Sequence, residues 1–565
     1  MERVQGSPLP LGVNEIEGRT NFAIAVPEGE KCSLLLYKAG EKVPEITYEM
    51  PEDQAVGTVR FLSLDHWCPE DYEYNYEIGG EVTVDPYVKG ITGREEFNCT
   101  KPSDSHEVRG RVKLPSYDWE GDMPLQIPYH EVAAYSLHIR GFTKDSYSKI
   151  RHKGTFRGVT EKLSYLTELG INQIQCMPVY DFLENTQYVN YWGYGPGYYF
   201  APKAAYAAGA DPSLELKDMV KACHRAGIEV VLDFPFYDDV PTLMALECLR
   251  YYMWEYHIDG FILDPSKVRV EDIKADPVLK KTKIMQKRTD FQNVMRRFLK
   301  GDEGMVDGVI WWMRKNSKED GIFNYLASHN GFTLNDVVSY DGKHNELNGE
   351  NNQDGPEYNF SWNCGAEGPS RKKAVILLRE RQMKNAFLLL LLSQGTPSVL
   401  AGDEFANSQK GNNNVYCQDN ELGWINWRKL SRETELFQFV KELLAFRKAH
   451  PIFHPEKELQ GIDRMCCGTP DVSYHGENAW RVPSEIASRQ LGIYYCGECA
   501  GDDDCFVAYN MHWIPHTFAL PALKKGKSWY RVLTTDSGVL EEPELIKGQK
   551  KVEVDERTIV VFIGK

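Results

Sequence analysis

The first 118 residues alternate short apolar runs with turn-forming residues, a pattern typical of β-strands. Residues 21–26 and 32–37 are apolar runs, and a Pro-Glu-Gly segment separates them. Residues 72–77 alternate aromatic and polar side chains, as expected for a strand with one buried face. The pattern therefore predicts an all-β segment over residues 1–118.

The pattern changes between residues 128 and 450, where strand-like apolar runs alternate with helical segments. Residues 132–138, 171–178 and 229–233 have the composition of three strands. The first intervening helix ends at Gly170, a residue type favoured just after a helix. Regular alternation of strands and helices predicts βα units around a parallel sheet.

Residues 455–565 return to short strand-like runs. The runs at 491–495, 505–510 and 558–562 are rich in β-branched and aromatic residues and are bounded by turn residues. We therefore expect a C-terminal β-sandwich over 455–565.

Composition and charge narrow the range of partners. Hydrophobic residues make up 42% and charged residues 26% of the chain, which is ordinary for a soluble globular protein. The net charge of −17 at pH 7 disfavours a nucleic-acid partner. The N-terminal residues contain no apolar stretch of the signal-peptide kind, and the longest apolar run, 386–392, is too short to span a bilayer. We expect a cytoplasmic protein with no membrane partner.

The cysteines give no clear sign of a metal or redox site. The chain has 13 of them, scattered and odd in number, which fits reduced thiols in a cytoplasm. Cys496 and Cys499 form a CxxC pair with no second pair, and we interpret this spacing as coincidental. No loop has clear calcium-ligand spacing, so we predict neither a metal site nor a cofactor.

Residues 256–265 place a carboxylate at the end of a predicted buried strand. Gly260 opens the apolar run 261–263, and Pro265 stops it directly after Asp264. Barrel enzymes carry their catalytic groups at the carboxyl ends of parallel strands. Asp264 is therefore the first candidate catalytic residue.

The segment His-Ile-Asp-Gly-Phe-Ile-Leu-Asp at 257–264 resembles the fourth-strand motif of the α-amylase family of glycoside hydrolases, glycoside hydrolase family 13. Three further segments, at 190–194, 331–352 and 394–421, resemble its isoamylase and glycogen-debranching group. The resemblance implies an α/β fold with a (β/α)8 TIM barrel over 128–450. It also implies that an N-terminal β-sandwich over 1–118, of the glucan-binding type, and the C-terminal β-sandwich flank this barrel.

The resemblance assigns roles to the strand ends, and several positions depart from the family pattern. Asp264 occupies the nucleophile position, but Ile262 replaces the Arg that normally supports it. Lys287 stands at the general-acid position, and Asn330 stands at the position of the third carboxylate. Asp290, three residues beyond Lys287, is the candidate substitute acid.

These departures remove the groups that retaining hydrolysis requires. Such enzymes need two carboxyl groups at the scissile bond, one as nucleophile and one as acid and then base. A lysine with an ordinary pKa is protonated at neutral pH and does not alternate between these states. A neutral amide does not stabilise positive charge developing at the anomeric carbon. We therefore predict a catalytically silent pseudoenzyme.

The same family pattern predicts a group of sugar-contacting residues. Aromatic rings stack on the flat face of a sugar, and polar groups pair with its hydroxyls. The predicted substrate-binding residues are Tyr191, Trp192, Tyr194, Asp233, Asp238 and His329. An alternative for Trp192 is that it only packs its loop.

Three functions remain open at this point. The first is a non-catalytic protein that binds an α-glucan (glycogen, starch or maltooligosaccharide) or partners an active debranching enzyme or a second copy of itself. The second is an active α-1,6-glucan hydrolase with an atypical acid and base. The third is a structural module with a filled cleft, in which Lys287 pairs with Asp264 or Asp238.

Overall fold

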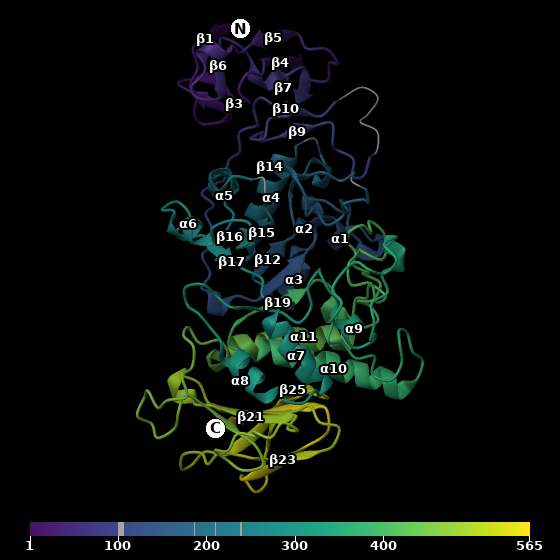
Figure 1. The fold of residues 1–565 in the computed structure, drawn as a ribbon. Coiled ribbons are helices and arrows are strands. Elements are labelled where there is room, and N and C mark those ends of the chain that lie inside the picture. Colours follow the sequence, from purple (N-terminus) through teal and green to yellow (C-terminus); the bar gives the residue numbers. More distant parts are fainter. Residues whose placement is uncertain (100–106, 186, 210, 238–239) are drawn as a thin grey trace.

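The computed structural model describes residues 1–565 except 100–106, 186, 210 and 238–239. Three parts follow one another along the long axis of the molecule (Figure 1). N-terminal strands lie at the top, helices and a parallel sheet lie in the middle, and C-terminal strands lie at the bottom. The predicted arrangement, a barrel of strands and helices with a β-domain on each side, is confirmed.

The N-terminal part consists of two antiparallel sheets packed around one core. Their strand orders are β1-β6-β3-β2 and β5-β4-β7-β10-β9, with β8 paired to β7. Phe22, Leu34 and Tyr76 are fully buried between them, as the alternating pattern predicts. The bounds are β1 (Glu2–Val4), β2 (Gly12–Ile16), β3 (Arg19–Ala25), β4 (Cys32–Lys38), β5 (Ile46–Glu49), β6 (Val59–Asp65), β7 (Tyr72–Ile78), β8 (Glu81–Thr83), β9 (Ile91–Thr92) and β10 (Arg109–Arg111).

The central part is a parallel sheet that curves into a nearly closed barrel. Seven strands are hydrogen-bonded in the order β17-β16-β15-β12-β11-β19-β18. They are β11 (Ala134–Leu137), β12 (Gln173–Cys176), β15 (Glu229–Phe234), β16 (Gly260–Leu263), β17 (Lys283–Met285), β18 (Phe323–Asn324) and β19 (Thr396–Leu400). An eight-stranded ring would need one more strand between β17 and β18. Along the described chain, the segment from β17 to β18 contains two helices joined by a turn at 301–305, and no strand.

Helices surround the barrel and connect its strands. They are α1 (Ile139–Thr143), α2 (Phe156–Thr160), α3 (Leu163–Leu169), α4 (Pro212–Arg225), α5 (Thr242–Tyr256), α6 (Val270–Ala275), α7 (Asp290–Lys300), α8 (Val306–Arg314), α9 (Leu334–Val337), α10 (Lys373–Leu391) and α11 (Thr434–Ala449). Gly170 follows α3 in the left-handed conformation and accounts for the predicted helix end. A hairpin of β13 (Tyr180–Phe182) and β14 (Gly197–Pro202) carries the 190–194 segment in its loop. None of the described helices is long and apolar enough to cross a membrane.

The C-terminal part is a six-stranded sheet covered by a two-stranded one. The strand orders are β20-β21-β22-β27-β24-β25 and β23-β26. Phe506, Trp529 and Phe562 fill the core between them. The bounds are β20 (Val472–His475), β21 (Gln490–Tyr495), β22 (Asp504–Asn510), β23 (His516–Ala519), β24 (Trp529–Thr534), β25 (Gly538–Leu545), β26 (Lys551–Val554) and β27 (Thr558–Gly564).

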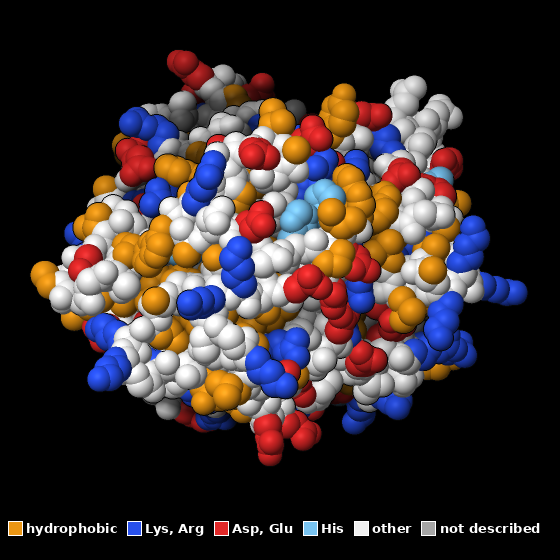
Figure 2. Space-filling view, turned by 90° about the horizontal axis from the view of Figure 1, so that it is seen from below, with side chains coloured by type: hydrophobic (Ala, Val, Ile, Leu, Met, Phe, Trp, Pro, Cys, Tyr) orange, Lys and Arg blue, Asp and Glu red, His pale blue; other side chains and the backbone are white. Residues whose placement is uncertain are grey.

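Polar side chains join the three parts. Arg111, at the end of β10, forms an ion pair of 2.7 Å with Asp211, the N-cap residue of α4. Asn385 on α10 donates to the Arg557 carbonyl at 2.7 Å and accepts a hydrogen bond from the Thr535 hydroxyl at 2.6 Å. Acidic and basic side chains are interspersed over the lower end of the molecule (Figure 2), so this end has no field of a single sign.

Candidate functional site

The predicted site residues follow neighbouring parallel strands and therefore lie at one end of the barrel. Asp233 is the penultimate residue of β15, and Asp264 directly follows β16. Lys287 follows β17 by two residues, whereas His329 and Asn330 lie beyond β18. Because β15, β16 and β17 pair in parallel register, their carboxyl ends meet at the same edge of the sheet.

Asp264 is exposed and begins a turn. Its Oδ1 accepts a hydrogen bond of 2.8 Å from the Ser266 amide, and its carbonyl accepts from the amides of Lys267 and Val268. Two residues earlier, Ile262 is 5% exposed and packs in an apolar cluster with Met285. An apolar side chain of the barrel interior therefore stands where the family pattern has a supporting Arg.

Lys287 is held in an ion pair with Asp233. Its Nζ lies 2.8 Å from Asp233 Oδ2, and the Tyr194 hydroxyl donates to the same oxygen at 2.6 Å. The prediction that Lys287 would pair with Asp264 is wrong, because the neighbouring strand β15 presents a carboxylate at the same edge. The other predicted partner, Asp238, lies outside the described residues.

His329 is a neutral imidazole packed among aromatic rings. Its ring stacks on Tyr194 with centroids 5.0 Å apart and meets the ring of Trp192 edge-on at 4.9 Å. Burial lowers the pKa of His329 well below its usual value, and the positive charge of Lys287 lowers it further. Its Nδ1 is buried and has no hydrogen-bond partner among the described residues.

The three aromatic residues predicted to stack on sugar differ in their surroundings. Tyr191 is 1% exposed and its hydroxyl donates to the Gly423 carbonyl at 3.1 Å, so it anchors the loop. Trp192 is 8% exposed, which favours the alternative in which it packs the loop. Tyr194 is half-buried, and the ring of His329 already covers one of its faces.

The remaining predicted residues are at the surface of this end. Asn330 is exposed, and its carbonyl accepts a hydrogen bond of 3.2 Å from the Ser328 hydroxyl. Asp290, the candidate substitute acid, is the exposed first residue of α7. A carboxylate there interacts favourably with the N-terminal end of the helix dipole, which explains its presence without a catalytic role.

Comparisons with known proteins agree with this geometry. Residues 133–237 match the family described as Alpha amylase, catalytic domain. Isoamylase 3, chloroplastic, of Oryza sativa is 30% identical over 95% of this chain and 83% of its own length. The chain belongs to the isoamylase group of the α-amylase family. A Glycogen operon protein GlgX homolog of Haemophilus influenzae is also 30% identical, over 78% of this chain and 84% of its own length.

The fold of this isoamylase-group chain also matches solved structures. A pullulanase from Bacillus acidopullulyticus superposes with a TM-score of 0.75, at 19% identity, over 98% of this chain and 75% of that chain. At that identity the likeness establishes the fold alone.

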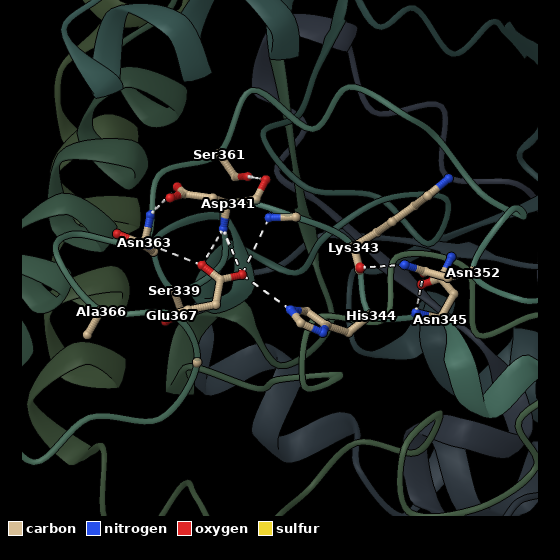
Figure 3. Close-up of polar contacts among 12 residues, drawn as sticks. Ser339, Asp341, Lys343, His344, Asn345, Asn352, Ser361, Asn363, Ala366 and Glu367 are labelled. Atoms are coloured by element: carbon tan, nitrogen blue, oxygen red, sulfur yellow. Dashed lines mark hydrogen bonds and ion pairs between the residues drawn. The ribbon is translucent and has the colours of Figure 1, made fainter.

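The isoamylase-like segment at 331–352 leads into a dense polar cluster (Figure 3). The Glu367 carboxylate accepts hydrogen bonds from the amides of Asp341 and Gly342 and from the Asn363 side chain. The His344 ring lies 3.2 Å from the same carboxylate. These contacts tie the loop at 341–344 to Asn363 and Glu367, and we call this group of residues the Glu367 cluster.

One residue of this site was not predicted, namely His138 at the end of β11. Its Nδ1 accepts a hydrogen bond of 2.9 Å from the Gly141 amide, and its Nε2 lies 3.0 Å from the Tyr206 hydroxyl. Burial lowers the pKa of His138 to about 3, so the ring is neutral. Its position after the first barrel strand, like that of Asp264 after the fourth, was the signal available in the sequence.

Two small cavities lined by described residues lie within this end of the barrel. One of about 20 Å³ is lined by Ile262 and Lys287, and one of about 40 Å³ is lined by His138, Trp192 and His329. Each has room for about one or two water molecules, which is far below the size of a sugar-binding pocket. No group of three or more His, Cys, Asp or Glu side chains in the described part of the chain is arranged to hold a metal ion.

Proposed function

We propose that this chain is a non-hydrolytic member of the isoamylase group, acting in storage α-glucan metabolism by binding an α-glucan or by partnering an active debranching enzyme. The observation that carries the proposal is the ion pair between Lys287 and Asp233. It occupies the strand end where the family pattern requires a titrating carboxyl group. A lysine in an ion pair does not provide the carboxyl group that serves as the acid and then the base of a retaining reaction.

The surroundings of Asp264 support the same conclusion. Ile262, which replaces the supporting Arg, is buried in the barrel interior and brings no charge to the nucleophile position. Asn330 contributes a neutral amide in place of the third carboxylate. Removing a general acid alone costs roughly 10²–10⁴ in rate, and losses within one catalytic unit leave little activity above background.

Glucan binding is supported by the aromatic and polar side chains that remain at this end of the barrel. His329 offers a neutral ring whose Nδ1 is unpaired within the described residues, and it stands beside the half-buried Tyr194. The relatives include proteins named isoamylase and glycogen operon protein, and a related pullulanase has been solved with maltohexaose. These names point to an α-glucan as the ligand class.

The experiment pairs binding with hydrolysis on the purified full chain. Glycogen and maltooligosaccharide binding is measured by affinity electrophoresis and calorimetry, and hydrolysis by reducing-sugar release from glycogen and a branched dextrin. We expect the chain to bind the glucan without releasing reducing sugar.

The His329→Ala variant should bind maltooligosaccharides at least several-fold more weakly. The His344→Ala variant, in the Glu367 cluster, should bind as the parent does.

Two results would overturn the proposal. Reducing-sugar release that disappears in Asp264→Asn would establish an active hydrolase with an atypical acid. Absence of binding to every glucan, together with no co-purification with an active debranching enzyme, would favour the structural module.

A further inference from the structure

The C-terminal sandwich brings together three thiols that lie apart in the sequence. Cys496 directly follows β21, and Cys499 ends the short 3-10 helix Gly497–Cys499. Cys467 lies in the loop before β20, 29 positions away from Cys496 along the chain. The Sγ atoms of Cys467 and Cys496 are 3.5 Å apart.

Strand pairing explains why these thiols meet. β20 and β21 are antiparallel, with Val472 opposite Tyr495. The chain that enters β20 and the chain that leaves β21 are therefore at the same end of the pair. The Cys496 amide also donates to the Asp471 carbonyl at 3.0 Å, which ties the two segments together beside the thiols.

The two facing thiols differ in accessibility. Cys496 is 2% exposed, whereas Cys467 is half-buried and open to a small reagent. The sulfur of Cys467 lies 3.4 Å from the Thr469 carbonyl oxygen and 3.6 Å from Asp463 Oδ1. Burial raises the pKa of Cys496, which favours its neutral thiol form.

The loop that carries Cys467 is held in place. Asp463 Oδ1 accepts a hydrogen bond of 3.0 Å from the Cys467 amide, and its Oδ2 accepts one of 2.8 Å from the Gly468 amide. The Lys524 ammonium, which is paired with Glu498, also lies close enough to both thiols to interact with them electrostatically.

We propose that Cys467 and Cys496 form a thiol–disulfide site that reacts with a low-molecular-weight disulfide of the oxidised glutathione type. The Cys467 thiolate attacks one sulfur of the reagent, which forms a mixed disulfide and releases one thiol. The Cys496 thiol then loses its proton to solvent and attacks the Cys467 sulfur, and the expelled thiolate takes up a proton from solvent to leave as the second thiol. Two protein thiols are oxidised by two electrons, and the reagent is reduced to two thiols.

The product bond needs only a short approach of the two sulfurs. A disulfide has an S–S length of about 2.05 Å, compared with the 3.5 Å separation of the two thiols. The bond would fasten the 463–471 loop to the end of β21. It would close a ring between positions 29 apart in sequence, which removes freedom from the unfolded chain.

The test treats the purified, fully reduced chain with oxidised glutathione and maps disulfides by mass spectrometry of a non-reduced digest. We expect a cross-link between Cys467 and Cys496 in the parent chain. The Cys496→Ser variant should instead retain glutathione on Cys467. Cys466→Ser is the matched control, because Cys466 is the adjacent, fully exposed thiol, and it should form the same cross-link as the parent.

Thermal unfolding gives a second readout. The oxidised parent should melt about 5 °C above the reduced parent, and the shift should be absent in Cys467→Ser. A cross-link confined to Cys496 and Cys499, the absence of any cross-link at Cys467, or stoichiometric zinc on these thiols in the protein as purified would overturn the proposal.

Discussion

At the scale of single residues, the candidate site is defined by which charged groups have partners. Lys287 and Tyr194 both contact Asp233, whereas the hydrogen bonds of Asp264 to other described residues come from backbone amides of its own turn. The strand end where the family pattern places a titrating acid carries an ion pair here. We therefore expect the stability of the barrel to depend on a residue that the family pattern would assign to catalysis.

Replacing Lys287 with Met tests this dependence. Asp233 is 7% exposed, and the substitution leaves its carboxylate with the Tyr194 hydroxyl as its remaining hydrogen-bond partner. We expect the free energy of unfolding to fall by about 1–3 kcal/mol, as measured by urea denaturation. Lys318→Met is the control, since Lys318 and Glu456 form an exposed pair whose loss should cost less than about 1 kcal/mol. Equal losses in both variants would contradict the prediction.

Glu404 is a second residue whose charge state affects stability. It is fully buried, and its Oε1 accepts hydrogen bonds from the hydroxyls of Tyr135 and Tyr165. Burial raises the pKa of Glu404 from 4.5 to about 7. The folded chain therefore holds this proton more tightly than the unfolded chain does, and stability is lost as the pH rises from about 4.5 to 7.

The Glu404→Gln variant should remove this pH dependence. Relative to the variant, the parent should lose about 3 kcal/mol of unfolding free energy between pH 4.5 and 7.5. Urea unfolding of both proteins across this range measures the difference. A difference that stays constant with pH would show that the carboxyl group does not titrate in this window.

At the scale of elements, the close pairing of β16 and β17 brings Asp264 and Lys287 to one edge. Gly260 opens β16 opposite Lys283, the first residue of β17. A Cβ atom at position 260 would lie 2.7 Å from the Cβ of Lys283 and 2.8 Å from its carbonyl oxygen. The glycine in the His-Ile-Asp-Gly segment is therefore required by the approach of two backbones.

Gly260→Ala should push these strands apart. We expect a loss of about 1–3 kcal/mol in unfolding free energy, measured by urea denaturation. Gly342→Ala is the matched control, because a Cβ there would meet no atom within 4 Å. An effect of Gly260→Ala no larger than that of the control would contradict the close approach.

At the scale of the whole molecule, the barrel and the C-terminal sandwich share buried polar contacts. Asn385 on α10 is fully buried and bonds to Thr535 and Arg557 of the sandwich. The Arg557 side chain in turn donates to the carbonyls of Leu299 and Lys300 at the end of α7. The two parts should therefore unfold together.

Asn385→Ala should weaken both parts at once. The substitution leaves a buried hydroxyl and a buried carbonyl without this partner, at a cost of about 2 kcal/mol. Calorimetry should give a single transition for the barrel and the sandwich in the parent, shifted to lower temperature in the variant. Gln438→Ala, at an exposed hydrogen bond on α11, should leave the midpoint within about 1 °C. Separate transitions for the two parts in the parent would contradict this coupling.

Apolar periodicity predicted the β, βα and β segments of the chain, and the family motifs implied the barrel. Both signals lie within short stretches of sequence, which is why they could be found without the structure. The alternating runs in 1–118, the βα repeats and the Asp264 strand end are all properties of neighbouring residues. The substitutions at Ile262, Lys287 and Asn330 were also visible, since each lies inside a recognisable motif.

Contacts between distant segments depended on the tertiary structure. Lys287 pairs with Asp233, 54 positions away, because β15 and β17 flank β16 and present their ends at one edge. Cys467 reaches Cys496 because β20 and β21 are antiparallel. Burial lowered the pKa of the His329 ring and decided which aromatic side chains are covered. These properties depend on three-dimensional proximity and exclusion of water, which no local pattern specifies.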